Sequence, residues 1–499
     1  MSPVKLKLSI MMFLQYAIWG AWAVPMGAYL GSVLGFTGAQ IGLIYGTTAI
    51  AAMISPLYMG FLADKMFATE KMIAILHLVG AALMFAAAYT TDFTPLWVIM
   101  LIYAMCYMPT LALTNSISFA NIKEPEKEFP PIRVWGTWGW IVVGWIVGFV
   151  LQNPKMKDVL PAVIQTPNSP IVLSGVFSAL LGVFALTLPH TPPAGKNASA
   201  ALPADDRQGV LSLLKDPSFL VFVVCSFFIC IPLSFYYSFA NVFLGEIDAP
   251  YPTALQTIGQ LSEVGFMAAM PFFIARLGVK KMLAVGMAAW VVRYFCFGTL
   301  AFPLVVFGLV LHGICYDFFF VASQIYVDSR VTAATRASAQ SFIAFVTLGV
   351  GMFVGNYLAG KTVDAYPSSQ VVATVKGDKG TSESKKVAIP AWDVTGEKGL
   401  AKALSLKEDG TLTADALPAE LVENEGEANE IRYAKADLAE AVKKADANSD
   451  GKVTRLEWRV AQRKDWFHIW LWPALGALAS MILFWLGFRD PVKAASTTA

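Results

Sequence analysis

Two carboxylates stand inside long apolar stretches of this sequence and are the first candidates for chemistry. Glu263 lies about half-way along a predicted helix over residues 252–275, and Asp317 lies deep in another over 303–326. If these helices cross a bilayer, a charge near the centre costs about 2.5 to 3.5 kcal/mol on insertion scales, so its retention needs a compensating role. A carboxyl group in a water-filled cavity binds a proton more readily once the cavity closes around it. We therefore expect Glu263 and Asp317 to bind and release protons.

Other polar side chains share helix faces in a way that suits a ligand with a ring and hydroxyl groups. Gln260 and Glu263 are three residues apart and lie on one face of their helix. Arg133 and Thr137 share a face of an earlier helix, and Trp140 follows three residues later. Together they suit a polyhydroxylated or heterocyclic ligand, because an indole can stack on a planar ring. Two alternatives stay open: Trp140 packs against lipid, and Arg133 reaches back to the membrane surface.

Two further polar residues belong to the same part of the chain. Arg293 lies near the middle of a predicted helix over 281–301, where it can neutralise an acid as a static buried pair or serve as a local counter-charge. His312 lies five residues before Asp317. For His312, and for His77 in the first half of the chain, the sequence leaves open a proton carrier or a hydrogen-bonded core histidine.

The composition indicates an integral membrane protein. The chain has 499 residues, of which 56% are hydrophobic and only 14% charged, and its mean hydropathy is +0.58. Soluble domains carry about 25% charged residues, so this chain has too few polar residues to cover a surface facing water. The formal net charge of +2 gives no reason to expect nucleic acid as a partner. All five cysteines lie in apolar runs, and we expect no disulfide.

The elements that must position the polar residues are apolar runs of about 20 residues, long enough to cross a bilayer. They predict an all-α polytopic membrane protein, because helices satisfy their own backbone hydrogen bonds in lipid. Twelve spans are expected, at residues 8–30, 39–63, 71–90, 94–119, 131–152, 169–189, 216–244, 252–275, 281–301, 303–326, 337–361 and 466–488.

A polar stretch divides these spans into two halves of six. We expect five segments: an N-terminal half over 1–190, a cytoplasmic linker over 191–215, spans 7 to 11 over 216–364, a polar insertion over 365–464, and span 12 with a tail over 465–499. The loops on one side carry most of the basic residues, namely Lys65, Lys71, Lys123, Lys127, Lys196, Arg207, Lys215, Arg276, Lys280, Lys281, Arg330 and Arg336. The opposite short loops carry only Lys155 and Lys157. This asymmetry predicts a cytoplasmic (inner) membrane protein with both termini in the cytoplasm.

Several stretches resemble a known family. The cytoplasmic loop "GFLADKMFATEK" between spans 2 and 3 carries part of the loop signature of the major facilitator superfamily, and "FFIARLGVKK" is its weak echo in the second half. The stretches "FLQYAIWGAWAVPMGAYL", "YMPTLALTNSISFA", "FPPIRVWGTWGW", "LSEVGF", "YDFFFVASQIYV" and "RASAQ" resemble the bacterial nucleoside:H⁺ symporters of that superfamily. The resemblance covers about four-fifths of the chain and implies proton-coupled uptake of nucleosides by alternating access.

The resemblance also assigns roles to residues. It implies that Arg133, Thr137, Gln260, Glu263 and Asp317 match polar cavity residues of the family, and that Glu263 and Asp317 couple protons. At four positions this chain differs from the family. Trp140 stands where the family has Phe, Ser234 and Tyr237 stand where it has Gln and Asn, and His312 stands where it has Tyr. We include these four among the expected substrate-binding residues.

The insertion contains a calcium-binding pattern. "DANSDGKVTRLE", residues 446–457, has the spacing of a twelve-residue EF-hand loop, with Gly451 at the turn, and helical patterns flank it. The expected Ca²⁺ ligands are Asp446, Asn448, Asp450, the Lys452 carbonyl, Thr454 through a water, and a bidentate Glu457. A second, decayed copy, "LKEDGTLTADAL", is expected to be a metal-free partner. We therefore expect a small helical EF-hand-like insertion, outside the membrane in the periplasm, in which calcium stabilises the structure rather than regulates it.

Three functions remain in competition. The leading one is proton-coupled nucleoside uptake by a monomer surrounded by membrane lipid. The first alternative is a symporter or facilitator for another polar solute such as a sugar, and the second is a calcium-sensing receptor that does not transport. An enzyme is not expected, because the sequence has no phosphate-binding loop, metalloprotease motif or nucleophile elbow. The sequence does not name the nucleoside, the acid that carries the proton, or the stoichiometry.

Overall fold

The chain forms two units, seen here in a computed structural model. The first unit comprises Met1–Asp364 with Trp470–Ala499, and the second comprises Ala365–Ile469. The structure describes residues 2–65, 68–156, 159–192, 212–331, 335–376, 382–390, 392, 400, 404, 410–423 and 430–489. Most of the expected linker, residues 193–211, therefore lies outside the described residues, and so do Lys157, Lys196, Arg207 and the side chains of Lys65 and Arg336.

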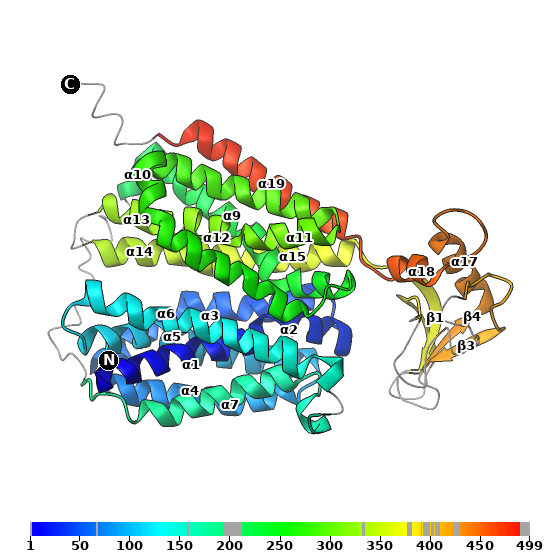
Figure 1. The fold of residues 1–499 in the computed structure, drawn as a ribbon, viewed down its shortest axis with the longest axis horizontal. Coiled ribbons are helices and arrows are strands. Elements are labelled where there is room, and N and C mark those ends of the chain that lie inside the picture. The colour runs from blue at the N-terminus through cyan, green and yellow to red at the C-terminus, as the bar shows by residue number, and fades with distance from the viewer. Residues whose placement is uncertain are drawn as a thin grey trace. The chain divides into compact units, whose positions relative to one another are not determined.

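The first unit is a bundle of long apolar helices in two halves, which Figure 1 shows as two groups of roughly parallel ribbons. The N-terminal half contains α1 (Pro3–Ala23), α2 (Met26–Ala28), α3 (Gly38–Lys65), α4 (Thr69–Ala88), α5 (Phe93–Ala120), α6 (Pro125–Trp145) and α7 (Ser169–Ala185). The C-terminal half contains α9 (Pro217–Glu246), α10 (Pro252–Gly298), α11 (Phe302–Val310), α12 (His312–Tyr316), α13 (Ala322–Ser329), α14 (Arg336–Ala344), α15 (Met352–Ala365) and α19 (Trp466–Gly487).

These helices account for twelve membrane passes. Ten helical segments of the described residues are long and apolar enough to cross a membrane, and one of them, α10, is 47 residues long. Helix α10 holds two passes because Gly278, at φ +70° and ψ 170°, interrupts it at the predicted boundary between spans 8 and 9. The shorter α7 completes the set. The all-α multi-pass fold expected from the sequence is confirmed.

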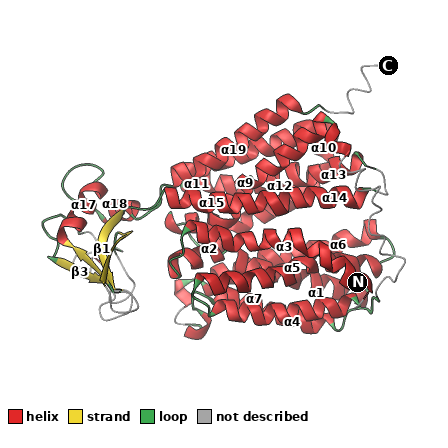
Figure 2. Cartoon of the chain, turned by 180° about the vertical axis from the view of Figure 1, so that it is seen from behind, coloured by secondary structure: helices red, strands yellow, loops and turns green. Residues whose placement is uncertain are grey.

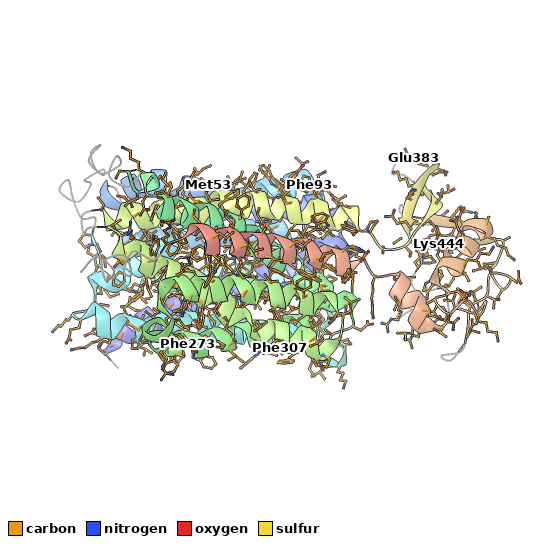
Figure 3. The ribbon with its side chains drawn as sticks, turned by 90° about the horizontal axis from the view of Figure 1, so that it is seen from above. Met53, Phe93, Phe273, Phe307, Glu383 and Lys444 are labelled. Carbon is orange, nitrogen blue, oxygen red and sulfur yellow. The ribbon has the colours of Figure 1, made fainter. Side chains whose placement is uncertain are left out.

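The outside of the bundle is apolar, as expected for contact with lipid. Large hydrophobic side chains such as Val183 and Phe307 are 60% and 48% exposed, and Figure 3 shows Phe307 at the edge of the bundle. Exposure of so much apolar surface to water would cost free energy, whereas contact with the hydrocarbon chains of lipids does not.

Several helices depart from regular α geometry. In the described residues, four π-helical turns interrupt the bundle, at Tyr29–Val33, Ile146–Leu151, Asp317–Val321 and Phe345–Gly351. Such turns are frequent at functional sites. The third of them begins at Asp317, one of the two acids singled out above.

The two ends of the bundle are distinguishable. Helix α1 begins and α19 ends at the same end, which we call the terminal end (Figure 1). Helix α15 ends and α19 begins at the other, which we call the insertion end. At the terminal end Lys5 pairs with Glu128 at 3.2 Å in the N-terminal half, and Arg330 pairs with Asp216 in the C-terminal half.

The second unit contains a sheet that the sequence analysis missed. Its strands are β1 (Gln370–Lys376), β2 (Ser382–Ala388), β3 (Glu420–Glu423) and β4 (Ile431–Ala434), and they form an antiparallel sheet in the order β2-β1-β4-β3. Figure 2 shows the strands of this unit in yellow. The expectation of a helical insertion was therefore incomplete, because strands of four to seven residues leave too short an alternation to distinguish from a polar loop.

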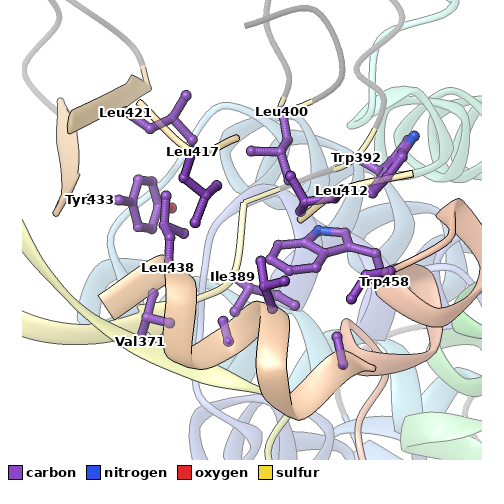
Figure 4. Close-up of a cluster of buried hydrophobic side chains, with 14 of the residues drawn as sticks. Val371, Ile389, Trp392, Leu400, Leu412, Leu417, Leu421, Tyr433, Leu438 and Trp458 are labelled. Atoms are coloured by element: carbon purple, nitrogen blue, oxygen red, sulfur yellow. The ribbon is translucent and has the colours of Figure 1, made fainter. Parts of the chain in front are cut away.

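Two helices and a compact core complete this unit. They are α17 (Lys435–Ala445) and α18 (Arg455–Ala461), on either side of the expected calcium loop. Apolar side chains of the strands and helices pack into one buried cluster that includes Leu412, Leu438 and Trp458 (Figure 4). Charged side chains such as Glu383 and Lys444 project from the surface (Figure 3). The insertion thus has its own hydrophobic core.

Candidate functional site

On the N-terminal side, the site is built on α1 and α6. The guanidinium of Arg133 lies 4.2 Å from the ring centroid of Tyr16 on α1, a distance typical of a cation–π contact. Thr137 lies one turn further along α6 and is partly buried. The indole of Trp140 packs edge-on against Trp19, with the ring centroids 5.8 Å apart. These contacts turn the polar face of α6 towards α1.

A hydrogen-bonded network stands beside this face, within the N-terminal half. Gln15 donates to Thr110 Oγ1 at 2.7 Å and lies 2.9 Å from His77 Nε2, while His77 Nδ1 lies 3.2 Å from Ser178 Oγ. Tyr107 donates to the backbone carbonyl of Gln15 at 2.6 Å. Both ring nitrogens of His77 therefore have partners. This histidine is a hydrogen-bonded core residue, and the network fixes the position of α1.

On the C-terminal side, Glu263 faces the other half. It lies near Arg133 and Tyr16 of the N-terminal half and near Tyr237 and Tyr316 of its own half. No ion pair within 4.0 Å joins Glu263 to Arg133 in the described part of the chain, so the two charges face one another without direct contact.

Gln260 lies on the same face of α10, three residues before Glu263. Its Oε1 atom is buried and has no hydrogen-bond partner in the structure. A buried amide oxygen without a partner loses free energy unless a ligand or water donates to it. The face of α10 predicted from spacing thus carries one unsatisfied acceptor beside the acid.

Asp317 lies one layer deeper in the C-terminal half. It is 0% exposed, and neither carboxylate oxygen has a hydrogen-bond partner. Its charge interacts with that of Glu263. An ionised carboxylate with no partner in such surroundings is very unfavourable, whereas the protonated acid is tolerated. The geometry suits a group that changes its protonation state.

Arg293 does not neutralise either acid in the described residues, contrary to one expectation from the sequence. It is 0% exposed, its Nη1 atom lies 2.9 Å from His312 Nδ1, and its guanidinium carbon lies 3.7 Å from the ring centroid of Tyr236. His312 is 1% exposed and lies beside Tyr236, with the ring centroids 5.1 Å apart. Helix α9 supplies the tyrosine, α10 the arginine and α12 the histidine.

The two site residues expected on α9, Ser234 and Tyr237, lie in different surroundings. Tyr237 lies near Glu263 and Tyr316, with which it interacts electrostatically. Ser234 lies at the contact between α9 and α15, where it is 0% exposed and donates to the Cys230 carbonyl at 2.9 Å. The structure therefore places Tyr237 with the other expected site residues and Ser234 apart from them.

Three tyrosines of the site were not singled out from the sequence. Tyr16, Tyr236 and Tyr316 contact or face the charged residues described above. Aromatic residues make up 13% of the chain, so composition does not distinguish these three from tyrosines that pack against lipid.

At the insertion end the two halves are in close contact. Asp364, at the end of α15, accepts hydrogen bonds from Gly38 N at 2.5 Å and Ala39 N at 2.8 Å, and so caps the N-terminus of α3 in the other half. A Cβ atom at Gly42 would lie 2.2 Å from the Asn356 carbonyl oxygen, so only glycine allows this approach.

A second contact at this end joins α6 and its π-helical extension to α9 and α10. Thr253 donates to Gln152 Oε1 at 2.8 Å and accepts from Asn241 at 3.1 Å, while Trp145 donates to Thr257 at 3.0 Å. These hydrogen bonds tie the halves together at the insertion end.

Towards the terminal end, α10 is poorly covered. Between Leu261 and Lys281 only Met270 is buried. Val264 and Met267, beside the acid Glu263, are 40% and 45% exposed. Helix α10 is therefore largely exposed over this stretch.

The expected calcium loop has the hydrogen bonds of a formed turn. Asp446 Oδ2 accepts from Gly451 N at 2.8 Å, and Asp450 Oδ1 accepts from Lys452 N at 2.7 Å. Gly451 has φ +79°. Glu457 accepts from both the backbone N and the hydroxyl of Thr454, in a capping box that begins α18. The described residues hold no group of three or more His, Cys, Asp or Glu side chains placed to bind a metal.

The decayed second loop pairs with the first through one β-bridge. Leu412 and Val453 exchange two backbone hydrogen bonds, each of 2.8 Å. Most of the second copy's expected ligand positions, Ser405, Lys407 and Asp409, lie outside the described residues.

Comparisons with known proteins agree with this architecture. A family model described as "Nucleoside H+ symporter" matches residues 1–375. YegT of Escherichia coli (strain K12) is 43% identical over 71% of this chain and 83% of its own length. The xanthosine permease of the same organism is 34% identical over 73% of this chain and 88% of its own.

Solved structures give the same result. The crystal structure of the nucleoside transporter NupG matches with a TM-score of 0.66 and 30% identity, over 74% of this chain and 93% of that chain. A mutant of NupG matches with a TM-score of 0.71 and 25% identity, over 97% of this chain and all of that chain. A D-xylose-proton symporter, at 12% identity and a TM-score of 0.56, shares the fold alone.

Proposed function

Because the chain belongs to the nucleoside H⁺ symporter family of the major facilitator superfamily, we propose that its central residues bind one nucleoside between the two halves. The protein is a multi-pass inner-membrane transporter rather than an enzyme, and it takes up nucleosides together with protons. The observation that carries the proposed site is the proximity of Glu263 to Arg133 across the halves, with no direct ion pair between them. A neutral polar solute bound between such groups would be contacted by both halves.

The proposed roles follow from the contacts. Gln260 offers the solute an unsatisfied acceptor, and Arg133 and Thr137 offer donors from the opposite half. Glu263 and Asp317 exchange protons as a coupled pair, since their charges interact. Tyr237, His312 and Trp140 would complete the site as aromatic walls, whereas the buried and bonded Ser234 supports α9.

The alternating cycle can be placed relative to the membrane. We propose that the terminal end faces the cytoplasm and the insertion end the periplasm, in line with the distribution of basic loops. The contacts of Asp364 and Thr253 then close the site on the outside, while the poorly covered half of α10 faces inward. Uptake would require the halves to rock about the central site and break these outer contacts. We also propose that a single chain, surrounded by lipid, is the working unit.

Uptake measurements test this proposal. Cells that express the protein should accumulate radiolabelled uridine, and a protonophore should abolish the accumulation. Unlabelled nucleosides should compete, and sugars should not. The Glu263→Gln variant should lose pH-driven accumulation, whereas the exposed control Glu124→Gln should retain it. Competition by sugars alone would instead support another polar solute, and full accumulation by Glu263→Gln would remove this acid from the coupling.

We propose further that the loop over residues 446–457 binds Ca²⁺ and stabilises the insertion. The sequence spacing supports such an ion, since Asp446, Asn448, Asp450, Thr454, Glu457 and the Lys452 carbonyl supply oxygen ligands in the required order. The acidic side chains would have to move together to bind it. The turn at Gly451 and the bridge from Leu412 to Val453 hold the loop in a compact form. Binding would require Glu457 to leave its capping contacts with Thr454.

Limited proteolysis tests the calcium proposal without reference to transport. Addition of Ca²⁺ to the metal-free full-length protein should slow cleavage within residues 365–464, and Mg²⁺ should do so less. The Asp446→Asn variant should lose the protection. Equal cleavage with and without Ca²⁺ at millimolar concentration would exclude a stabilising ion.

A further inference from the structure

The contact between Arg293 and His312 determines where the histidine carries its proton. Arg293 Nη1 lies 2.9 Å from His312 Nδ1. A guanidinium can only donate hydrogen bonds, so Nδ1 must be the acceptor. The single proton of a neutral imidazole then sits on Nε2. The pair therefore fixes one of the two tautomers of His312.

Arg293 is held in place for this contact by aromatic faces. Its guanidinium carbon lies 3.7 Å from the ring centroid of Tyr236, 5.2 Å from that of Trp290 and 5.4 Å from that of Phe297. Such faces partly compensate a buried cation. Within the described residues no carboxylate lies within 4.0 Å of the guanidinium, which leaves its hydrogen-bonding capacity for neutral partners such as His312.

The other side of the imidazole is directed at the helix that carries the proposed solute contacts. A Cβ atom at Gly259 would lie 3.0 to 3.2 Å from atoms of His312, so this ring packs directly on α10. Gly259 precedes Gln260 by one residue and Glu263 by four. Among the described residues His312 Nε2 has no hydrogen-bond partner, although the residue as a whole is only 1% exposed. Its N–H group is therefore left for a partner that a solute bound beside α10 would supply.

We propose that Arg293 is a positioning residue that fixes His312 as a neutral Nε2–H donor to a hydrogen-bond acceptor of the nucleobase. This inference rests on the proposed function for the identity of the solute. A tyrosine hydroxyl, which the family resemblance places at this position, can donate or accept, whereas the imidazole held by Arg293 can only donate. The site thereby selects bases that present a carbonyl or ring nitrogen at this point and disfavours those that present an amino group.

Nuclear magnetic resonance tests the tautomer directly and needs no nucleoside. The chain has four histidines, so ¹⁵N-histidine labelling of the full-length protein in phosphatidylcholine–phosphatidylglycerol vesicles gives few signals. The His312→Tyr variant assigns the signal of interest. Wild type should show His312 protonated on Nε2, and Arg293→Met should show a mixture of tautomers. Protonation on Nδ1 in wild type, or an unchanged spectrum in Arg293→Met, would overturn the proposal.

A double-mutant cycle then tests the consequence for uptake. Arg293→Met should raise the KM for uridine by the inverse of the Nε2–H fraction that its resonance spectrum shows, with little change in the maximum rate, because only that tautomer donates to the solute. In the His312→Tyr background the same substitution should change KM less than twofold, because a phenol needs no fixed tautomer. Arg293→Lys should restore most of the wild-type KM, since an ammonium group also donates to Nδ1.

The outcomes separate the two proposals. An equal rise in KM in both backgrounds would show that Arg293 only supports the fold, and the inference would fail while nucleoside uptake stands. If wild type did not transport uridine or any other nucleoside, the proposed function would fail, and the resonance measurement would still decide the tautomer. Should Arg293→Met not fold, the wild-type resonance spectrum still decides the tautomer, and protonation of His312 on Nδ1 there overturns the proposal.

Discussion

The acids of the helix bundle and those of the insertion loop have opposite surroundings. Asp317 is completely buried, and neither of its oxygens has a partner. In the loop, Asp446, Asp450 and Glu457 lie at the surface, and each accepts hydrogen bonds from backbone N–H groups of the same turn. A carboxylate without partners gains from binding a proton, whereas one that accepts several N–H bonds gains from staying ionised.

This difference indicates which acids of the protein can change their protonation state. The bundle leaves the buried acid Asp317 without partners, whereas His77 and Gln15 of the N-terminal half have hydrogen-bond partners. The insertion compensates its acids and leaves none of those three without a partner. Asp364 stands between these extremes, because its carboxylate caps a helix of the other half and must lose those bonds when the halves separate.

The largest effect is expected from Asp317→Asn. The amide cannot exchange a proton, so accumulation driven by a proton gradient should fall to background, while exchange of labelled for unlabelled nucleoside at equal pH should continue. The melting temperature should not fall, because an uncompensated acid is replaced by a neutral group of the same shape. Vesicle uptake with and without an imposed gradient measures this. Asp92→Asn, at an exposed position, is the control. If Asp317→Asn still accumulates nucleoside when a proton gradient is imposed, Asp317 does not take part in proton coupling.

An intermediate effect is expected from Asp364→Ala. Loss of the two bonds to Gly38 and Ala39 should shift the equilibrium towards the state open at the insertion end by about 1 kcal/mol, which is about fivefold. Pulsed electron paramagnetic resonance can follow it through the distance between spin labels at Ser32 and Gly245, one in each half.

Asp364→Asn provides the matched comparison for these two hydrogen bonds between the halves. It keeps one acceptor oxygen and should shift the population less than the alanine variant. Identical distance distributions in the wild type and in Asp364→Ala would mean that the cap does not contribute to closing this end.

The smallest effect is expected at Glu457. Hydrogen bonds from the Thr454 backbone and hydroxyl lower the pKa of this carboxyl below its ordinary value of 4.5. The contribution of the capping box to the stability of the insertion is therefore present above about pH 4.5 and is lost as the pH falls through the lower folded-state pKa.

Amide hydrogen exchange in α18, measured in metal-free buffer between pH 6 and pH 3, can detect this loss once the intrinsic pH dependence of exchange is removed. Glu457→Gln should flatten the profile, whereas Glu440→Gln, in the neighbouring α17, should leave it unchanged. A wild-type profile identical to that of Glu457→Gln would show that the capping box does not contribute measurably to the stability of α18.

The fold was largely accessible from the sequence. Apolar runs of about 20 residues give the number of passes, and Gly278 divides α10 at the boundary placed between two of those runs. The sheet of the insertion was not accessible, because its strands are short and pair mainly through backbone groups that any polar sequence possesses.

The candidate site was accessible only in part. Spacing identified Gln260 with Glu263 and Arg133 with Thr137, since helical periodicity determines which residues share a face. It did not identify the partner of Arg293, because an arginine in an apolar helix suggests an acid, and here His312 and the ring of Tyr236 take that place. Nor did it separate Ser234 from Tyr237, whose directions depend on how α9 packs against α15.

The amino-acid sequence is enough to predict that this protein crosses a membrane many times and keeps acids within it, because hydrocarbon tolerates only long apolar helices and makes every retained charge costly. Which charged residues lie together depends on how the helices pack. The contacts of Arg133 with Tyr16, of Arg293 with His312 and of Asp364 with Gly38 each join residues of different helices. Their geometry depends on how the helices pack, and the spacing along one helix does not contain that information.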